Sequence, residues 1–102
     1  MTQKIEQVCF DTSIEPLDPA TVHQVELATG RMMPVAAFGT FHSDWAQDYM
    51  FDATLEAIRI GWRHIDTARA YENEDVVGAA IKEAINRDYI TSVDELFITA
   101  KL

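Results

Sequence analysis

The sequence predicts an α/β fold in which short strands alternate with amphipathic helices. Three short apolar runs of strand type are separated by two segments whose apolar residues recur every three or four positions. The composition supports a packed domain, because 48% of the residues are hydrophobic and 25% are charged. Strands that are separated by single helices pair in parallel through right-handed crossovers.

The first third of the chain predicts an irregular segment, a hairpin and a strand. We expect residues 1–23 to form an N-terminal extension, in which Pro16 and Pro19 break any helix. Residues 25–35 contain two extended runs around Gly30, a residue that readily takes the positive φ of a turn, and we expect a hairpin here. Residues 35–39 are short and apolar throughout, which is typical of a strand buried on both faces.

The next segment predicts a helix followed by a strand. Residues 48–60 have one apolar face, with Asp48 as a suitable N-cap and Gly61 placed to end the helix. Its predicted core-facing residues are Met50, Ala53, Thr54, Ala57 and Ile58. Residues 63–66 then predict a short second strand.

The last third predicts a second helix and a third strand. Asn73 can cap a helix over residues 74–87, and residues 92–95 fit a capping box. Residues 95–102 predict the third strand. The apolar face of the second helix contains Val77, Ala80, Ile81, Ala84 and Ile85.

Net charge, cysteine content and hydropathy limit the partners and the cellular compartment that the chain can have. The net charge of −9 argues against a nucleic-acid partner, which requires clustered Lys and Arg. A single cysteine, Cys9, forms no internal disulfide and fits a reducing compartment. The first 23 residues are acidic and lack the apolar core of a secretory signal, and no apolar run approaches the roughly 18 residues of a membrane span. We therefore expect a cytoplasmic protein with no membrane partner.

Two architectures begin with this order of elements: a doubly wound open sheet and a β/α barrel. A dinucleotide-binding open sheet would carry G-x-G-x-x-G after its first strand, and the four glycines of the chain do not have that spacing. Polar residues do follow successive strands, namely Thr40, Asp66 and Lys101. Barrel enzymes place their catalytic groups at that end of the strands, so the pattern favours the barrel and leaves the open sheet as the alternative.

Asp66, Tyr71 and Lys101 form the candidate catalytic set. Free tyrosine has a pKa of about 10, too high for an efficient acid near neutrality. A neighbouring ammonium lowers that pKa, and a carboxylate keeps the ammonium charged and oriented. We expect a buried Lys101 held by Asp66 to tune Tyr71 to protonate a carbonyl oxygen, while a cofactor supplies the hydride.

Each residue also has a simpler interpretation when taken alone. Asp66 could cap a turn, Tyr71 could pack at the edge of a loop, and Lys101 could be an exposed lysine at a strand end. His64 is more simply a packed strand residue than a metal ligand, and no set of residues has zinc spacing. A receiver-like signalling module with Asp66 as phosphoacceptor is a further alternative, although residues 38–40 lack the acidic pair such a module needs.

Three motifs in the right order resemble the aldo-keto reductase family. Residues 61–74 (GWRHIDTARAYENE) are similar to its signature G-x-R-H-x-D-T-A-x-x-Y-x-N-E. Upstream, residues 33–40 (MPVAAFGT) resemble M-P-x-x-G-x-G-T, with Ala37 where the first glycine is common. Downstream, residues 96–102 (LFITAKL) resemble L-F-I-x-x-K-L.

This resemblance implies an NADPH-dependent reductase of aldehydes and ketones built on a (β/α)8 barrel. Its catalytic residues here would be Asp66, Tyr71 and Lys101. Gly39, Thr40 and Phe41 would bind the cofactor, with Asp66 near its ribose. No metal is implied, and the full-length family is expected to be monomeric.

The resemblance covers only the beginning of such a barrel. Residues 24–102 would contain the hairpin and the part from the first to the third strand, whereas a complete barrel takes roughly 250 residues. The third strand would have an open edge, so we expect a marginally stable or aggregation-prone chain without measurable turnover of its own. The alternative function is a non-catalytic chain that binds a full-length partner through that edge.

Overall fold

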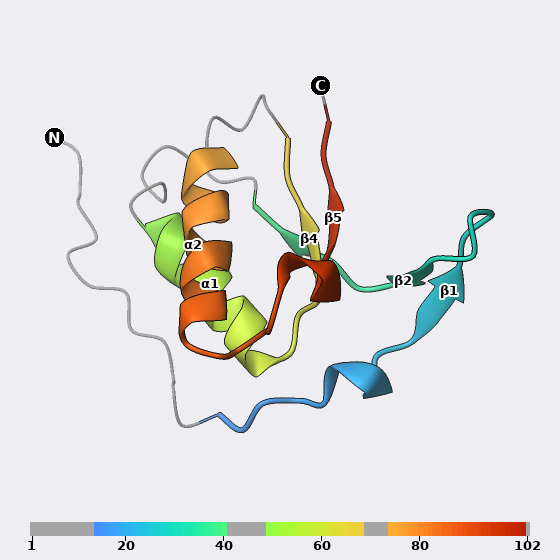
Figure 1. The fold of residues 1–102 in the computed structure, drawn as a ribbon, viewed down its shortest axis with the longest axis horizontal. Helices are drawn as coiled ribbons and strands as arrows, with labels where there is room; N and C mark the ends of the chain where they lie inside the picture. The colour runs from blue at the N-terminus through green and yellow to red at the C-terminus, as the bar shows by residue number, and fades with distance from the viewer. Residues whose placement is uncertain (1–13, 41–48, 69–73, 102) are drawn as a thin grey trace, which may run out of the picture.

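The computed structural model describes residues 14–40, 49–68 and 74–101, which form a helix layer, a parallel sheet and a hairpin (Figure 1). The two α-helices lie together on one side of the sheet, and the hairpin projects on the other side. The sheet has the order β3-β4-β5, with both pairs of strands parallel. Its strands are β3 (Phe38–Gly39), β4 (His64–Asp66) and β5 (Phe97–Thr99).

The predicted hairpin is confirmed. Strand β1 (Gln24–Glu26) pairs antiparallel with β2 (Met32–Pro34), and Gly30 takes a φ of +88° in the connecting turn. A short 3-10 turn, η1 (Pro19–Thr21), precedes the hairpin. The proline that was expected to break a helix therefore begins a helical turn, where its missing N–H costs nothing.

The first strand of the sheet is shorter and more exposed than the sequence predicted. Only Phe38 and Gly39 pair with β4, and Val35 is 52% exposed. The N–H of Val35 donates instead to the carbonyl of His23, which extends the hairpin by one bond. The expectation of a strand over residues 35–39 buried on both faces is wrong, because this segment mainly connects the hairpin to the sheet.

Both predicted helices are present. Helix α1 (Met50–Ile60) ends at Gly61, whose φ of +123° is one that side-chain-bearing residues rarely adopt. Helix α2 (Glu74–Asn86) packs against α1, and a third helical turn, η4 (Val93–Glu95), leads into β5. The N-cap of α1 is Tyr49, which makes no side-chain capping bond, so the prediction of Asp48 as N-cap is wrong. Asn73, the proposed cap of α2, lies outside the described residues.

The helix layer and the sheet share one apolar core. Ile58 of α1 and Ile65 of β4 are fully buried, and burial stabilises each such side chain by roughly 1.5–3 kcal/mol. The other members of the core cluster are Met50, Leu55, Val77, Ala80, Ile81, Ala84, Ile90 and Leu96. Most of the predicted core faces are confirmed, while Ala53 and Ile85 are only half-buried and the buried Leu55 was not predicted.

Arg63 fastens the helix layer to the start of β4. Its guanidinium donates to the carbonyls of Ile58 (2.7 Å), Trp62 (2.9 Å) and Tyr89 (3.2 Å), so it contacts the end of α1 and the loop after α2. Burial lowers the pKa of this guanidinium, and the nearby Glu95 partly offsets that effect. One planar cation thus joins the last turn of α1 to the loop after α2 through three backbone carbonyls.

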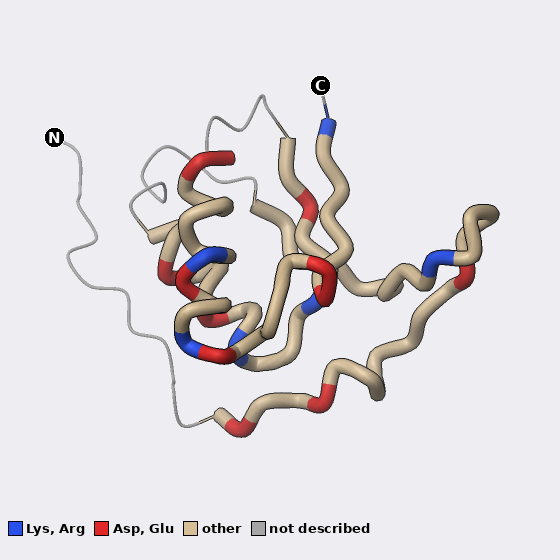
Figure 2. The backbone as a smooth tube through the Cα atoms, viewed as in Figure 1, with Lys and Arg blue, Asp and Glu red and all other residues tan. Residues whose placement is uncertain are grey.

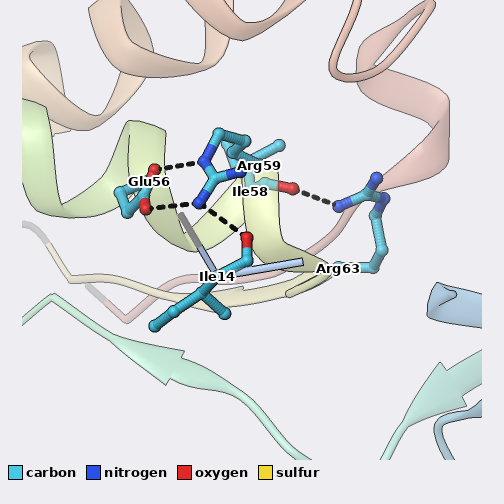
Figure 3. A network of polar contacts seen from close by, with 5 residues as sticks. All are labelled: Ile14, Glu56, Ile58, Arg59 and Arg63. Carbon is cyan, nitrogen blue, oxygen red and sulfur yellow. Dashed lines mark hydrogen bonds and ion pairs between the residues drawn. The ribbon is translucent and has the colours of Figure 1, made fainter. Parts of the chain in front are cut away.

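The segment before η1 is tied to the C-terminal end of α1 (Figure 3). Arg59 forms an ion pair with Glu56 and donates to the carbonyl of Ile14 at 3.2 Å. The N–H of Leu17 donates to the carbonyl of Ile60 at 2.9 Å. A Cβ atom at Gly61 would lie 2.7 Å from the carbonyl oxygen of Leu17, so the segment passes closer to α1 than any side chain at position 61 allows.

Charges are distributed unevenly over the described residues. Figure 2 shows acidic positions on both helices and on the N-terminal segment, whereas the basic positions are scattered rather than gathered into one patch. Among the described residues, no helix is long and apolar enough to span a membrane.

Candidate functional site

The candidate site lies at the C-terminal edge of the parallel sheet. Gly39 of β3 is the register partner of Asp66, and Asp66 is the register partner of Thr99. Because the strands are parallel, the residues that follow them meet at the same edge. Two of the three predicted catalytic residues, Asp66 and Lys101, are brought together there.

Asp66 and Lys101 form a direct ion pair. The Nζ atom of Lys101 lies 2.8 Å from Oδ1 of Asp66, and the side chains are 56% and 33% exposed respectively. Hydrogen bonds from Lys101 and then from Thr99 lower the pKa of the Asp66 carboxyl, with a further contribution from the charge of Lys101. The pairing is as expected, but the expectation of a buried cation is wrong, because more than half of the Lys101 side chain is exposed.

Thr99 is a second partner of the same carboxylate. Its hydroxyl donates to Oδ1 of Asp66 at 2.7 Å. The sequence analysis did not single out Thr99. No local signal marks it, because a threonine in a strand becomes a candidate only once the β4–β5 register places it beside Asp66.

Thr40 holds the backbone at this edge. It is fully buried, and both its N–H (3.0 Å) and its hydroxyl (2.9 Å) donate to the carbonyl of Asp66. Its predicted contact with a cofactor remains a prediction. The observed bonds show that it fixes the end of β4 relative to β3.

Gly39 leaves open space beside the carboxylate. It is exposed, and a Cβ built on it would have no neighbouring atom within 4 Å. Since register partners on adjacent strands share a face, that space lies on the same face as the side chain of Asp66. This open space leaves room for a flat ring or a ribose to approach the backbone.

Two predicted site residues cannot be placed. Tyr71, the predicted proton donor, and Phe41, a predicted cofactor contact, both lie outside the described residues. The geometry therefore covers the Asp66–Lys101 part of the predicted catalytic set and leaves its tyrosine as a prediction.

His64 is a packed strand residue, as the sequence analysis favoured. It is 6% exposed, its Nδ1 lies 2.8 Å from the carbonyl oxygen of Pro34, and its ring packs edge-on against Phe97. In the described part of the chain, no three His, Cys, Asp or Glu side chains lie close enough to hold a metal ion.

Comparison with known proteins identifies the family. The family model described as "Aldo/keto reductase family" matches residues 35–102. This chain belongs to the aldo-keto reductases. The match excludes the doubly wound alternative, and it gives no support to a signalling receiver.

Individual aldo-keto reductases agree with this assignment. The chain is 47% identical over 75 residues to a 7-acetyl-epi-neemfruitin B aldo-keto reductase of Melia azedarach, covering 74% of this chain and 23% of that protein. It is 43% identical over 82 residues to the NADPH-dependent codeinone reductase 1-5 of Papaver somniferum, covering 79% and 26%.

A solved structure shows the same fold. The aldo-keto reductase of Bombyx mori, solved in complex with NADP, matches with a TM-score of 0.73 and 38% identity over 79% of this chain and 27% of that one. The described elements are therefore the N-terminal part of a (β/α)8 barrel preceded by its hairpin. The chain spans about a quarter of the length of these relatives.

Proposed function

We propose that this chain supplies the aspartate, tyrosine and lysine of an NADPH-dependent site that reduces aldehydes or ketones to alcohols. The observation that carries the proposal is the 2.8 Å contact between Lys101 Nζ and Asp66 Oδ1 at the carboxyl ends of adjacent parallel strands. The names of the relatives support the cofactor and the reaction, because one is an NADPH-dependent reductase and another was solved with NADP.

Each residue has a separate task in the proposed reaction. Asp66 keeps Lys101 charged and in place, and the ammonium of Lys101 favours the ionised phenol of Tyr71 and so lowers its pKa. The phenol then gives its proton to the substrate oxygen and is left as phenolate, to be reprotonated from solvent. NADPH, when bound, supplies the hydride that the carbonyl carbon accepts.

The cofactor would lie against the open space beside Asp66. Gly39, Thr40 and Phe41 are the proposed contacts, with Asp66 accepting a hydrogen bond from a ribose hydroxyl. We further propose that residues 1–23 form an extension and residues 24–102 the barrel part, and that the whole protein is a cytoplasmic monomer.

The test measures consumption of NADPH with a panel of aldehydes and ketones. It compares the longest protein product that contains this chain with its Tyr71→Phe and Lys101→Met variants. Removing the proton donor should lower turnover by about 10²- to 10⁴-fold. Equal turnover in Tyr71→Phe and the parent would contradict the proposal. The 102-residue chain assayed alone should show none, because a complete barrel takes roughly 250 residues.

A second candidate is a non-catalytic chain that adds its sheet to a full-length partner. It is favoured by the exposure of Ile98, 40%, on a strand that among the described residues pairs on one side only. Co-purification of the 102-residue chain with a full-length aldo-keto reductase from the same source tests it. Recovery of monomer only would count against this candidate.

A further inference from the structure

A line of polar contacts continues from the Asp66–Lys101 pair into the covered interior of the described fold. Asp66 accepts from Thr99, the Thr99 hydroxyl lies 3.5 Å from Nε2 of His64, and Nδ1 of His64 lies 2.8 Å from the carbonyl oxygen of Pro34. The proposed reaction uses Asp66 and Lys101 and assigns no task to the other three residues.

We propose that Thr99 is a positioning residue of the reductase site, whose hydroxyl holds the Asp66 carboxylate in the orientation in which it pairs with Lys101. Its importance for turnover rests on the proposed function. The placement of the carboxylate itself does not, and it can be measured separately.

The single proton of the Thr99 hydroxyl has two possible acceptors. A carbonyl oxygen only accepts, so Nδ1 of His64 carries the proton in its 2.8 Å contact with Pro34. In the neutral ring Nε2 then only accepts, and it competes with Asp66 for the hydroxyl proton. The contact with the carboxylate is shorter, 2.7 Å against 3.5 Å, and hydrogen bonds to an ionised acceptor are the stronger ones, so the proton belongs to Asp66.

The surroundings of Thr99 hold its hydroxyl in this direction. His64 is nearly fully buried and cannot turn away, because one ring nitrogen is bonded to the hairpin and the ring packs 5.0 Å from that of Phe97. The imidazole is thus a fixed neighbour of the Thr99 hydroxyl. Asp66 is held between a fixed hydroxyl and a lysine whose side chain is 56% exposed.

Holding the carboxylate matters because Lys101 is a long, largely exposed side chain. An exposed ion pair alone restrains its partners weakly, since both side chains lose conformational entropy and compete with water. A short hydroxyl contact from a strand residue, whose position the β4–β5 register fixes, gives Asp66 one rigid anchor. The lowered pKa of Asp66, caused first by Lys101 and next by Thr99, agrees with this arrangement.

The test measures the pKa of Asp66 by the carbon-13 shift of its carboxyl group in the 102-residue chain. Thr99→Val keeps the shape of the side chain and removes the hydroxyl, so the pKa of Asp66 should rise toward its ordinary value, and Thr99→Ser should restore it. Thr67→Val is the matched control, because the Thr67 hydroxyl is buried and has no hydrogen-bond partner among the described residues. That variant should leave the pKa of Asp66 unchanged.

Each outcome decides the proposal. An unchanged pKa in Thr99→Val overturns it, and so does a rise that Thr99→Ser fails to restore, because the effect would then come from packing. If Thr99→Val does not fold, the parent chain still gives an answer: the Cβ shift of Thr99 should titrate with the same midpoint as the Asp66 carboxyl, and a flat Thr99 signal overturns the proposal. Absence of Tyr71-dependent NADPH consumption would instead overturn the proposed function and leave the pKa result for Thr99 intact.

Discussion

The two ends of the parallel sheet are held together by different kinds of contact. At the C-terminal end, Asp66, Thr99 and Lys101 meet through side-chain hydrogen bonds, and the charged groups stay partly exposed. At the other end, the segment around Leu17 is bonded through its backbone to the end of α1, close against Gly61. The first arrangement leaves groups accessible for chemistry, and the second covers and fixes the helix layer.

This difference places the contacts that stabilise the fold at one end and the proposed reductase site at the other. Barrel enzymes generally use the carboxyl ends of their strands for catalysis and the opposite face for stability. Substitutions near Gly61 should therefore change the free energy of unfolding, whereas substitutions at Lys101 should change turnover with little effect on folding.

The largest expected effect on stability is that of Gly61→Ala. Its φ of +123° is strained for alanine, which costs about 1–3 kcal/mol, and the new Cβ would also approach the Leu17 carbonyl at 2.7 Å. Urea unfolding should show a loss of at least that size. Gly78→Ala is the control: it lies exposed in α2 with nothing within 4 Å of a new Cβ, so it should stabilise the chain by about 0.5–1 kcal/mol. Equal changes in the free energy of unfolding for Gly61→Ala and Gly78→Ala would refute the stabilising role of the close contact at Gly61.

A smaller loss is expected from Arg59→Met. Its guanidinium forms a two-bond ion pair with Glu56, in which both side chains are about one-sixth exposed (16% and 15%), and it also holds the carbonyl of Ile14. We expect the free energy of unfolding, measured in urea, to fall by about 1 kcal/mol, and this loss should change little with salt. The matched control is Arg87→Met, because the pair of Arg87 with Glu83 is more exposed, so its loss should change the free energy of unfolding less, and less still at high salt. A larger loss of unfolding free energy in Arg87→Met than in Arg59→Met would contradict the stabilising role of the contacts around the end of α1.

The smallest effect on stability is expected from Lys101→Met, about 0.5 kcal/mol or less at neutral pH, because the pair is largely exposed. Its signature is the pH dependence. Lys101 and Thr99 lower the folded-state pKa of Asp66, so the contribution of the ionised carboxyl is complete above the unfolded pKa of about 4 and is lost as the pH falls through the folded value.

Unfolding of the parent and the variant should therefore converge below pH 4 and differ above it. The measurement is the difference between the free energies of unfolding of the parent and the variant at each pH. A difference is needed because Glu95 also has a lowered pKa, caused first by the hydroxyl of Thr91, and contributes equally to both proteins. A gap between the two curves that stays constant from pH 2 to pH 7 would exclude the Asp66 pair as its cause.

The sequence predicted the elements whose signals are local. Apolar periodicity predicted α1 and α2, and Gly61 marked the end of α1 correctly. The order of strands and helices predicted the parallel sheet, and residues at strand ends predicted the Asp66–Lys101 pair.

The features that the sequence did not reveal depend on distant contacts. The segment around Val35 is apolar enough for a buried strand, but its backbone bonds to the hairpin at His23. The hydrogen bond between Arg59 and Ile14 joins residues 45 positions apart. The exposure of Lys101 was not predicted, because the local sequence does not show how much of the end of a strand is covered by the rest of the fold. Thr99 was missed because a hydroxyl becomes informative only when the register places it opposite a carboxylate.

Arg63 has a consequence for how the described part of the chain opens. Its guanidinium bonds at once to the last turn of α1 and to the loop after α2, so neither helix end can detach without breaking a contact that the other shares. The amides of Gly61 and Tyr89, which bond to carbonyls near the ends of the two helices, should then exchange with solvent deuterium at closely similar free energies, as members of one cooperative unit. Arg63→Leu should separate these two exchange rates and divide one opening event into two.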